Sequence, residues 1–90
     1  MLEEYQKLGI ISLKGKFVMK VENIKELVEK LIERRKELGI SQSDLAQLCN
    51  LSVNGISKFE SNAGEREVKL STLFKLSEVL GFKLSLEFEQ

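Results

Sequence analysis

The spacing of apolar residues changes twice along this chain of 90 residues, and that change constrains the fold more than any other feature. From Ile11 to Val21 most apolar residues occupy alternate positions, which is the period of a β-strand. From Ile24 to Leu38 they recur at helical spacing, on one face of an α-helix. From Phe82 to Phe88 the alternation returns. The pattern predicts a mainly α-helical domain with a β-strand at each end.

The first strand has an alternative interpretation. Lys14 and Gly15 lie in the middle of the alternating segment, and glycine readily adopts the positive φ that a tight hairpin turn requires. A short hairpin that turns at these two residues is therefore the second interpretation, after one continuous strand. The sequence leaves open whether the N-terminal strand pairs within the chain or with another copy.

Capping residues predict four helices between the strands. A Ser or Asn before a helix accepts a hydrogen bond from its first turn, and a Gly after the last turn adopts the left-handed conformation. Ser41 also has an acidic residue three positions on, Asp44, as in a capping box. The predicted helices are residues 24–38 between Asn23 and Gly39, residues 42–49 after Ser41, residues 53–61 after Ser52, and residues 72–80 between Ser71 and Gly81.

The connections between these helices indicate one domain. Asn50 is expected to form a tight turn between the second and third helices, because asparagine tolerates the left-handed conformation. Residues 62–69 have the composition of a polar loop. No linker, internal repeat or low-complexity tract interrupts the order. We therefore divide the domain into an N-terminal strand-containing extension at residues 1–22, a helical core at 23–81 and a C-terminal strand at 82–90.

Composition argues against catalysis and metal binding. The chain has no histidine, which is the commonest general base and a common metal ligand. Its one cysteine, Cys49, cannot form a disulfide framework or a zinc finger, and we expect it to be a small buried apolar residue. The sequence therefore predicts a protein that is not an enzyme and that uses no metal and no cofactor.

Charge and hydropathy bear on location and partners. The sequence shows no apolar run long enough to span a bilayer and no secretory-signal pattern, so we expect a cytoplasmic protein with no membrane contact. Its 14 basic and 14 acidic residues cancel, which argues against a nonspecific nucleic-acid coat. A protein that reads a DNA groove needs only a local cationic face, so DNA remains possible.

One set of residues carries a family resemblance. It consists of the run from Ser41 to Ala46, the turn from Asn50 to Ser52 and the run from Ile56 to Glu60. Together they resemble the phage-repressor (Cro, or XRE) helix-turn-helix family over about residues 24–80. The resemblance implies a lambda-repressor-like bundle of about four helices, with residues 23–81 as a DNA-binding domain.

Packing explains several of the offsets in this motif. A small residue is needed where the two short helices cross closely, and Ala46 stands there. Four apolar residues are expected to fill the wedge between those helices. They are Leu45, Leu48, Leu51 and Ile56.

The third helix is the candidate recognition helix, because the second helix of such a motif enters the major groove. Asn54 can pair with adenine, Lys58 can donate to guanine, and Val53 can contact a thymine methyl group. Ser57 can donate or accept a hydrogen bond. The alternative is an ordinary solvated helix face. Gly55 is a poor helix former, and in this helix it lowers the stability by about 0.5–1 kcal/mol relative to alanine.

The resemblance assigns further roles. Gln42 would bind a DNA phosphate, with additional contacts along the same strand from Ser43, Ser52 and Asn62. Arg35 and Glu60 would form a partly buried ion pair with a structural role. Three surface cations are possible neighbours of the DNA backbone, although we favour an ordinary solvated role for them. They are Lys36, Arg66 and Lys69.

The two terminal strands are the candidate dimer interface. An unpaired strand exposes backbone donors and acceptors, and the last strand also exposes an apolar face. That face consists of Phe82, Leu84, Leu86 and Phe88. Lysines on the first strand and glutamates on the last would complement each other if the two strands paired. Because one recognition helix reads only a few base pairs, a homodimer on a palindromic operator is expected.

The run from Gly81 to Leu86 after the motif resembles the antitoxin branch of the family, the partners of HipA-type kinase toxins. In that branch the final strand helps to form the dimer, and the protein both represses its own operon and binds a toxin. Residues 1–22 have no clear counterpart there. The sequence thus predicts a sequence-specific repressor of transcription that binds double-stranded DNA. The alternative is an antitoxin whose main role is to neutralise a kinase-like toxin.

Overall fold

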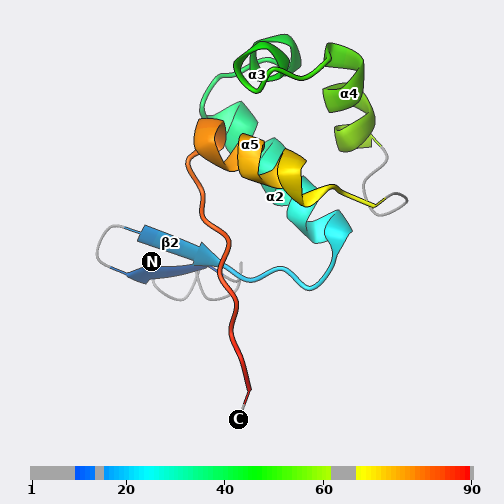
Figure 1. Ribbon diagram of the computed structural model, residues 1–90. Helices are drawn as coiled ribbons and strands as arrows, with labels where there is room; N and C mark the ends of the chain where they lie inside the picture. Colours follow the sequence, from blue (N-terminus) through cyan, green and yellow to red (C-terminus); the bar gives the residue numbers. More distant parts are fainter. Residues whose placement is uncertain (1–9, 14–15, 62–66, 90) are drawn as a thin grey trace.

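The computed structural model describes residues 10–13, 16–61 and 67–89. Four helices pack together in this part of the chain, and a short hairpin lies to one side of them (Figure 1). The elements are β1 (Ile10–Leu13), β2 (Lys16–Met19), α2 (Ile24–Glu37), α3 (Gln42–Leu48), α4 (Val53–Ser61) and α5 (Leu70–Leu80). The predicted mainly helical, lambda-repressor-like architecture is therefore confirmed.

Side chains cap the N-termini of α2 and α3. The Asn23 side chain accepts a hydrogen bond of 2.9 Å from the backbone of Glu26 at the start of α2. Ser41 Oγ accepts one of 3.0 Å from the backbone of Asp44, whose carboxylate accepts one of 3.4 Å from the Ser41 backbone, so the capping box of α3 is complete. Gly39 has a φ of 69°, as predicted for the residue that follows α2.

The turn between α3 and α4 also follows the prediction. Asn50 has a φ of 55°, and it is the one residue other than glycine with a positive φ in the described part of the chain. Ser52 Oγ then accepts a hydrogen bond of 2.9 Å from the backbone of Gly55, which caps α4.

The start of α5 differs from the prediction. The helix begins at Leu70 with Lys69 as its N-cap, and no side chain caps it. Ser71 lies within the first turn and is not the cap, because the first helical hydrogen bond already runs from the Leu73 backbone to the Lys69 carbonyl. The other end is as predicted, since Gly81 has a φ of 72° and donates to the Ser77 carbonyl at 2.9 Å.

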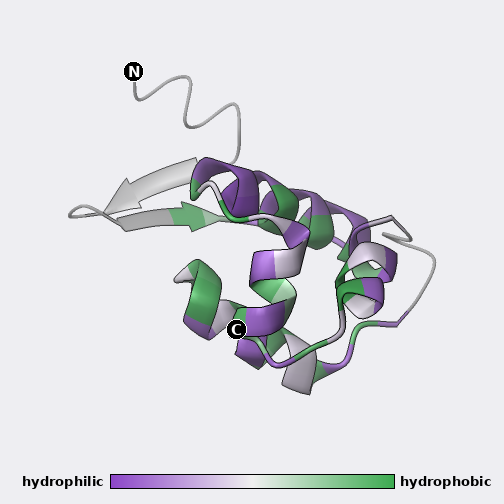
Figure 2. Ribbon diagram, turned by 90° about the horizontal axis from the view of Figure 1, so that it is seen from above, coloured by the Kyte–Doolittle hydropathy of each residue, from purple (hydrophilic) through white to green (hydrophobic). Residues whose placement is uncertain are grey.

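One apolar core joins the helices. Figure 2 shows hydrophobic and hydrophilic stretches on each helix, as expected of helices that each bury one face. The buried residues that form this connected core are Leu31 of α2, Leu45, Ala46 and Cys49 at α3, Ile56 of α4, and Leu73, Leu76 and Leu80 of α5. None of the described helices has both the length and the apolar character required to cross a bilayer.

Of the four residues predicted to fill the space between α3 and α4, three are correct and one is not. Leu45 and Ile56 are buried, and Leu51 packs partly buried against the core. Leu48 is 62% exposed, so its assignment to the wedge was wrong. A helix turns by about 100° per residue, and the buried side of α3 is centred between Leu45 and Ala46, which leaves Leu48 well outside that arc.

The N-terminal segment is a hairpin and not one continuous strand. β1 and β2 pair in antiparallel fashion, from Ile10 opposite Met19 to Leu13 opposite Lys16. The second interpretation of the sequence is therefore the correct one, although residues 14 and 15 themselves lie outside the described residues. Folding back lets the two halves satisfy each other's backbone hydrogen bonds, which a lone extended strand cannot do.

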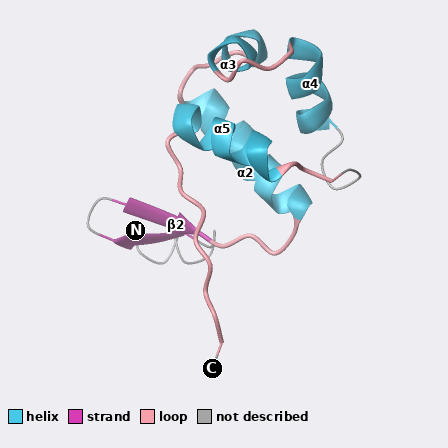
Figure 3. Cartoon of the chain, viewed as in Figure 1, coloured by secondary structure: helices cyan, strands magenta, loops and turns pink. Residues whose placement is uncertain are grey.

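The predicted C-terminal strand does not form in the single chain. Residues 82–89 have no regular secondary structure and leave α5 as a loop (Figure 3). The Phe82 backbone donates to the Ser77 carbonyl at 3.2 Å, but beyond it no backbone hydrogen bond joins this segment to the rest of the described chain. The prediction was wrong for one chain, because a strand requires a neighbouring strand and none of the described residues forms one beside this segment.

Candidate nucleic-acid interface

α3 and α4 lie together at one end of the molecule (Figure 1). Ala46 is 1% exposed and belongs to the same core cluster as Ile56 of α4, and its small side chain suits a close approach of the two helices. The Leu51 backbone donates to the Ala46 carbonyl at 2.8 Å, which ties the turn to the end of α3. The two helices are thus held at a fixed angle to each other.

One side of α4 faces the core and the other faces solvent. Ile56 is 1% exposed and Phe59 packs partly buried against the core. Of the four predicted base-reading residues, Val53, Asn54 and Lys58 are exposed and Ser57 is half-buried. Asn54 and Lys58 are four residues apart and therefore lie on the same side of the helix.

The exposed side of α4 is not covered by the described part of the chain. The Asn54 and Lys58 side chains form no hydrogen bond or ion pair with any described residue. Val53 adds an apolar side chain that is 48% exposed to the start of the same helix. An amide, an ammonium group and a branched apolar group are thus displayed together on a helix whose other face is fixed by the core.

Gly55 lies between these side chains for a spatial reason that the sequence did not reveal. A Cβ added at this position would lie 3.0 Å from Ser52 Oγ, which is closer than almost all real contacts of a Cβ atom. That hydroxyl is the cap of α4. The glycine therefore leaves room for the cap, besides leaving the backbone of α4 bare on its exposed side.

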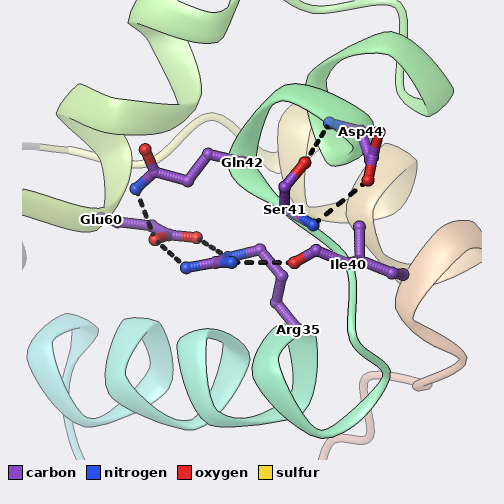
Figure 4. A network of polar contacts seen from close by, with 6 residues as sticks. All are labelled: Arg35, Ile40, Ser41, Gln42, Asp44 and Glu60. Atoms are coloured by element: carbon purple, nitrogen blue, oxygen red, sulfur yellow. Dashed lines mark hydrogen bonds and ion pairs between the residues drawn. The ribbon is translucent and has the colours of Figure 1, made fainter.

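Arg35 and Glu60 are brought together by the fold. Arg35 Nε lies 2.7 Å from Glu60 Oε2 and Nη2 lies 2.9 Å from Oε1, so the contact is bidentate (Figure 4). The Arg35 side chain is 11% exposed and that of Glu60 is 8% exposed. Arg35 Nη1 also donates to the Ile40 carbonyl at 2.8 Å. The guanidinium group thereby joins α2, the start of α3 and the end of α4.

Gln42 joins the same network. Its Nε2 donates to Glu60 Oε1 at 2.8 Å, so one N–H of the residue predicted to bind phosphate is already used within the protein. Sequence reasoning missed this contact, because the two residues are 18 positions apart and no local spacing links them. The second N–H of Gln42 forms no hydrogen bond with the described residues.

Two of the three other predicted phosphate-binding residues lie on the surface of the described structure. Ser43 and Ser52 are exposed, and Ser52 Oγ accepts the cap hydrogen bond but keeps its own proton to donate. Asn62 lies outside the described residues. Of the three surface cations, Lys36 and Lys69 are exposed and form no ion pair with described residues, while Arg66 lies outside them.

The predicted dimer residues follow α5. Phe82 packs partly buried against the core, whereas Leu84, Leu86 and Phe88 are 46%, 83% and 84% exposed. Elsewhere, no three acidic or cysteine side chains of the described chain gather as metal ligands would. Cys49 is buried, and burial raises the pKa of its thiol, with a smaller lowering by Lys75 and a smaller raising by Glu78.

Comparisons with known proteins agree with this arrangement. A family model described as helix-turn-helix matches residues 31–86, which include Arg35 and Glu60 as well as α3, α4 and α5. The chain is similar to a solved structure of a HipA-HipB-O2-O3 complex, with 26% identity and a TM-score of 0.69 over 81% of this chain and 100% of that one. The values are the same for a structure described as "MDT Protein".

A HipB-O1-O2 complex is similar in the same way, with 25% identity and a TM-score of 0.69 over 79% of this chain and 100% of that chain. No curated protein matches the sequence. The family model spans more than half of the chain and includes the whole of the α3–turn–α4 unit. The chain therefore belongs to the XRE-type helix-turn-helix family and resembles HipB within it.

Proposed function

We propose that this helix-turn-helix protein is a sequence-specific DNA-binding repressor of transcription, which acts as a dimer on a palindromic operator with α4 in the major groove. The observation that carries the proposal is the uncovered side of α4, where Asn54 and Lys58 point away from the core. A helix held this way can enter the groove without rearrangement of the protein. We assign the chain no catalytic activity.

The exposed side chains of α4 match the chemistry of base edges. The Asn54 amide pairs with the N6 and N7 positions of adenine, and the Lys58 ammonium donates to N7 and O6 of guanine. Val53 contacts a thymine methyl group, and Ser57 adds a donor or an acceptor at a shorter reach. Each good base pairing contributes about 1–3 kcal/mol of discrimination. Gly55 lets the backbone of α4 lie close to the floor of the groove.

Residues around the start of α3 and α4 bind the DNA backbone. Gln42 uses the N–H that Glu60 leaves available, and the exposed Ser43 and Ser52 contribute hydroxyl groups. Asn62 extends these contacts along the same strand of DNA. Contacts of this kind carry no sequence information, but they fix the register of the protein on the duplex.

Dimerisation places two recognition helices on one operator. Helix-turn-helix dimers read half-sites about 34–36 Å apart, so the operator is two-fold symmetric like the protein. The exposed apolar residues after α5 supply the interface, namely Leu84, Leu86 and Phe88 together with Phe82. A regulator of chromosomal DNA in this family works in the cytoplasm, where we place the protein.

A second function is favoured by one comparison. The whole of a HipB chain in a HipA-HipB-O2-O3 complex aligns with this protein. This likeness supports the alternative proposal, in which the protein is an antitoxin whose main role is to bind and neutralise a kinase-like toxin. Stable copurification with a HipA-type kinase that loses activity in the complex is the expected result for this role. A kinase that remains fully active in the presence of excess protein would exclude it.

Selection of bound sequences from a random pool of duplex DNA tests the repressor proposal. We expect enrichment of a two-fold symmetric consensus with adenine and guanine at equivalent places in both halves. The double variant Asn54→Ala and Lys58→Ala, run in parallel, should enrich no consensus although it stays folded. If the wild-type protein enriches no sequence, or if the double variant enriches the same one, the proposal is wrong.

A further inference from the structure

The segment that follows α5, residues 82–89, is called the C-terminal tail below. The backbones of Gly81 and Phe82 both donate to the Ser77 carbonyl, at 2.9 and 3.2 Å, and the Phe82 side chain packs partly buried against the core. Beyond Phe82, no backbone hydrogen bond joins the tail to the rest of the described chain. The direction of the tail is therefore set where it leaves α5.

The last carbonyl of α5 is held by another helix. Arg34 of α2 donates to the Leu80 carbonyl through Nε at 2.9 Å, although the two residues are 46 positions apart. The last carbonyls of a helix have no partner within it, and a cation near them is favourable because that end carries a partial negative charge. α5 has no basic residue in its own last turn. Arg34 therefore supplies the cation that the sequence of α5 lacks.

The three nitrogen atoms of the Arg34 guanidinium have three different neighbours. Nε bonds to the Leu80 carbonyl, and Nη1 lies 3.8 Å from Oε2 of Glu37 on the next turn of α2. Nη2 lies beside Gly81, where a Cβ added to the glycine would be 3.5 Å from it. The planar group is thus oriented against the turn that ends α5. A lysine ammonium is a single point charge and cannot be oriented in this way.

The next residue of α2 holds the recognition helix. Arg35 Nε and Nη2 lie 2.7 and 2.9 Å from the Glu60 carboxylate in the last turn of α4 (Figure 4). Consecutive residues of one turn of α2 therefore hold the end of α4 and the end of α5. α2 also packs against both of these helices. Through α2, the recognition helix and the start of the tail keep one relative orientation.

We propose that Arg34 is a positioning residue, which fixes the direction of the tail relative to α2 and thereby relative to α4. Its consequence rests on the proposed dimer, because a tail that supplies the interface also sets the separation of the two recognition helices. A rotation of about 10° over half of the molecule's longest extent of 37 Å displaces a helix by about 3 Å, close to the rise of about 3.4 Å per base pair of DNA. Arg34 thus decides which half-site spacing the dimer accepts.

Hydrogen exchange of the full-length protein, followed by NMR, tests the contact itself. In Arg34→Gln the amide protons of Gly81 and Phe82 should exchange at least about fivefold faster than in the wild-type protein, because the turn that they close opens more often. The amide proton of Leu76, in the middle of α5, should stay within about twofold of its wild-type rate. The Arg34 side chain is 45% exposed, so we expect the variant to fold.

Lys30→Gln is the matched control for this measurement. It removes a cation from α2 by the same substitution, and Lys30 pairs with Glu33 of its own helix at 3.9 Å. Its exchange rates at Gly81 and Phe82 should equal those of the wild-type protein. Equal rates at these two residues in Arg34→Gln and in the wild-type protein would overturn the proposal.

Operators with altered spacing test the consequence for DNA binding. Affinity is measured by fluorescence anisotropy on the selected operator and on versions with one base pair inserted or removed between the half-sites. The wild-type protein should lose at least about thirtyfold on each altered operator, whereas Arg34→Gln should lose less than about fivefold, because its two recognition helices are no longer held one helical turn apart. Both proteins and Lys30→Gln should keep the same base preferences within a half-site. A loss of stability alone would weaken binding to all operators equally, and that result would overturn the positioning role.

Arg34→Lys separates the oriented contact from the charge. This variant keeps a cation near the end of α5 but lacks the planar group, so its discrimination between spacings should resemble that of Arg34→Gln. Wild-type discrimination in Arg34→Lys would show that a charge alone is sufficient, and would overturn the assignment to the oriented guanidinium.

The two proposals can fail separately. If the wild-type protein enriches no DNA sequence, the repressor function is wrong, and the exchange rates still decide whether Arg34 holds the end of α5. If it enriches a two-fold consensus while Arg34→Gln keeps both the slow exchange and the spacing discrimination of the wild-type protein, Arg34 has no positioning role and the repressor function stands.

Discussion

Replacement of Glu60 by alanine should destabilise the domain far more than removal of an ordinary surface acid. The Glu60 carboxylate accepts hydrogen bonds of 2.7 and 2.9 Å from Arg35 and one of 2.8 Å from Gln42. After the substitution the Arg35 guanidinium keeps its 2.8 Å bond to the Ile40 carbonyl but loses its counter-charge. A cation that is 11% exposed cannot recover full hydration without local unfolding.

The magnitude follows from this loss. Removal of one partner of a buried ion pair costs about 3–5 kcal/mol, and the lower end applies here because some water reaches both side chains and one bond of Arg35 remains. We therefore expect a decrease of about 3 kcal/mol in the free energy of unfolding. For a domain of this size that corresponds to a decrease of about 12–24 °C in Tm.

Denaturation by urea, followed by circular dichroism, measures this change. The protein concentration must be the same for every variant, because a dimer gains stability with concentration. Glu37→Ala is the matched control, since Glu37 pairs with Arg34 at 3.8 Å with side chains 65% and 45% exposed. That exposed pair should contribute less than about 1 kcal/mol. Equal losses for Glu60→Ala and Glu37→Ala would refute the reasoning.

Three further predictions concern the cap, the tail and the thiol. In thermal denaturation, Gly55→Ala should change the free energy of unfolding by less than about 1 kcal/mol, because the gain in helix propensity is offset by displacement of the Ser52 hydroxyl that caps α4. A loss of several kcal/mol would contradict this. Deletion of residues 83–90 should give monomers with weaker operator binding, and sedimentation of an intact dimer would exclude the tail as the interface. Burial raises the pKa of the Cys49 thiol in the folded protein, so iodoacetamide should react with it more than about tenfold slower in the folded protein than in urea; equal rates would show that the thiol is accessible. The free energy of unfolding should fall as the pH rises above 9.0, because in that range the thiol of the unfolded chain loses its proton more readily than the buried thiol does.

Local signals in the sequence were enough to predict most of the helical fold. Asn23, Ser41 and Asn50 act through contacts within a few residues, so their roles could be inferred from neighbouring residues alone. Ser71 shows the limit of that reasoning. Its residue type suits a cap, but the helix begins earlier because Lys69 already accepts the first helical bond.

Features that depend on distant parts of the chain were predicted less well. The bond between Gln42 and Glu60 exists only because α3 and α4 are packed against each other. The exposure of Leu48 depends on which side of α3 faces the core, and a helix of seven residues is too short to show this by periodicity. Residues 82–89 have the alternation of a strand, but no strand of the described part of the chain lies beside them, and a local pattern cannot show whether a partner strand exists.

Whether the exposed side of α4 contacts bases is tested most directly by combining single protein variants with operators that are changed at single base pairs. Binding of wild-type protein, Asn54→Ala and Lys58→Ala is measured by fluorescence anisotropy against the operator and against operators changed at one base pair in each half-site. Each variant should become indifferent to one position, with a loss of about 1–3 kcal/mol per contact on the unchanged operator, and should keep its preferences elsewhere. Variants that keep every preference of the wild-type protein would contradict the account.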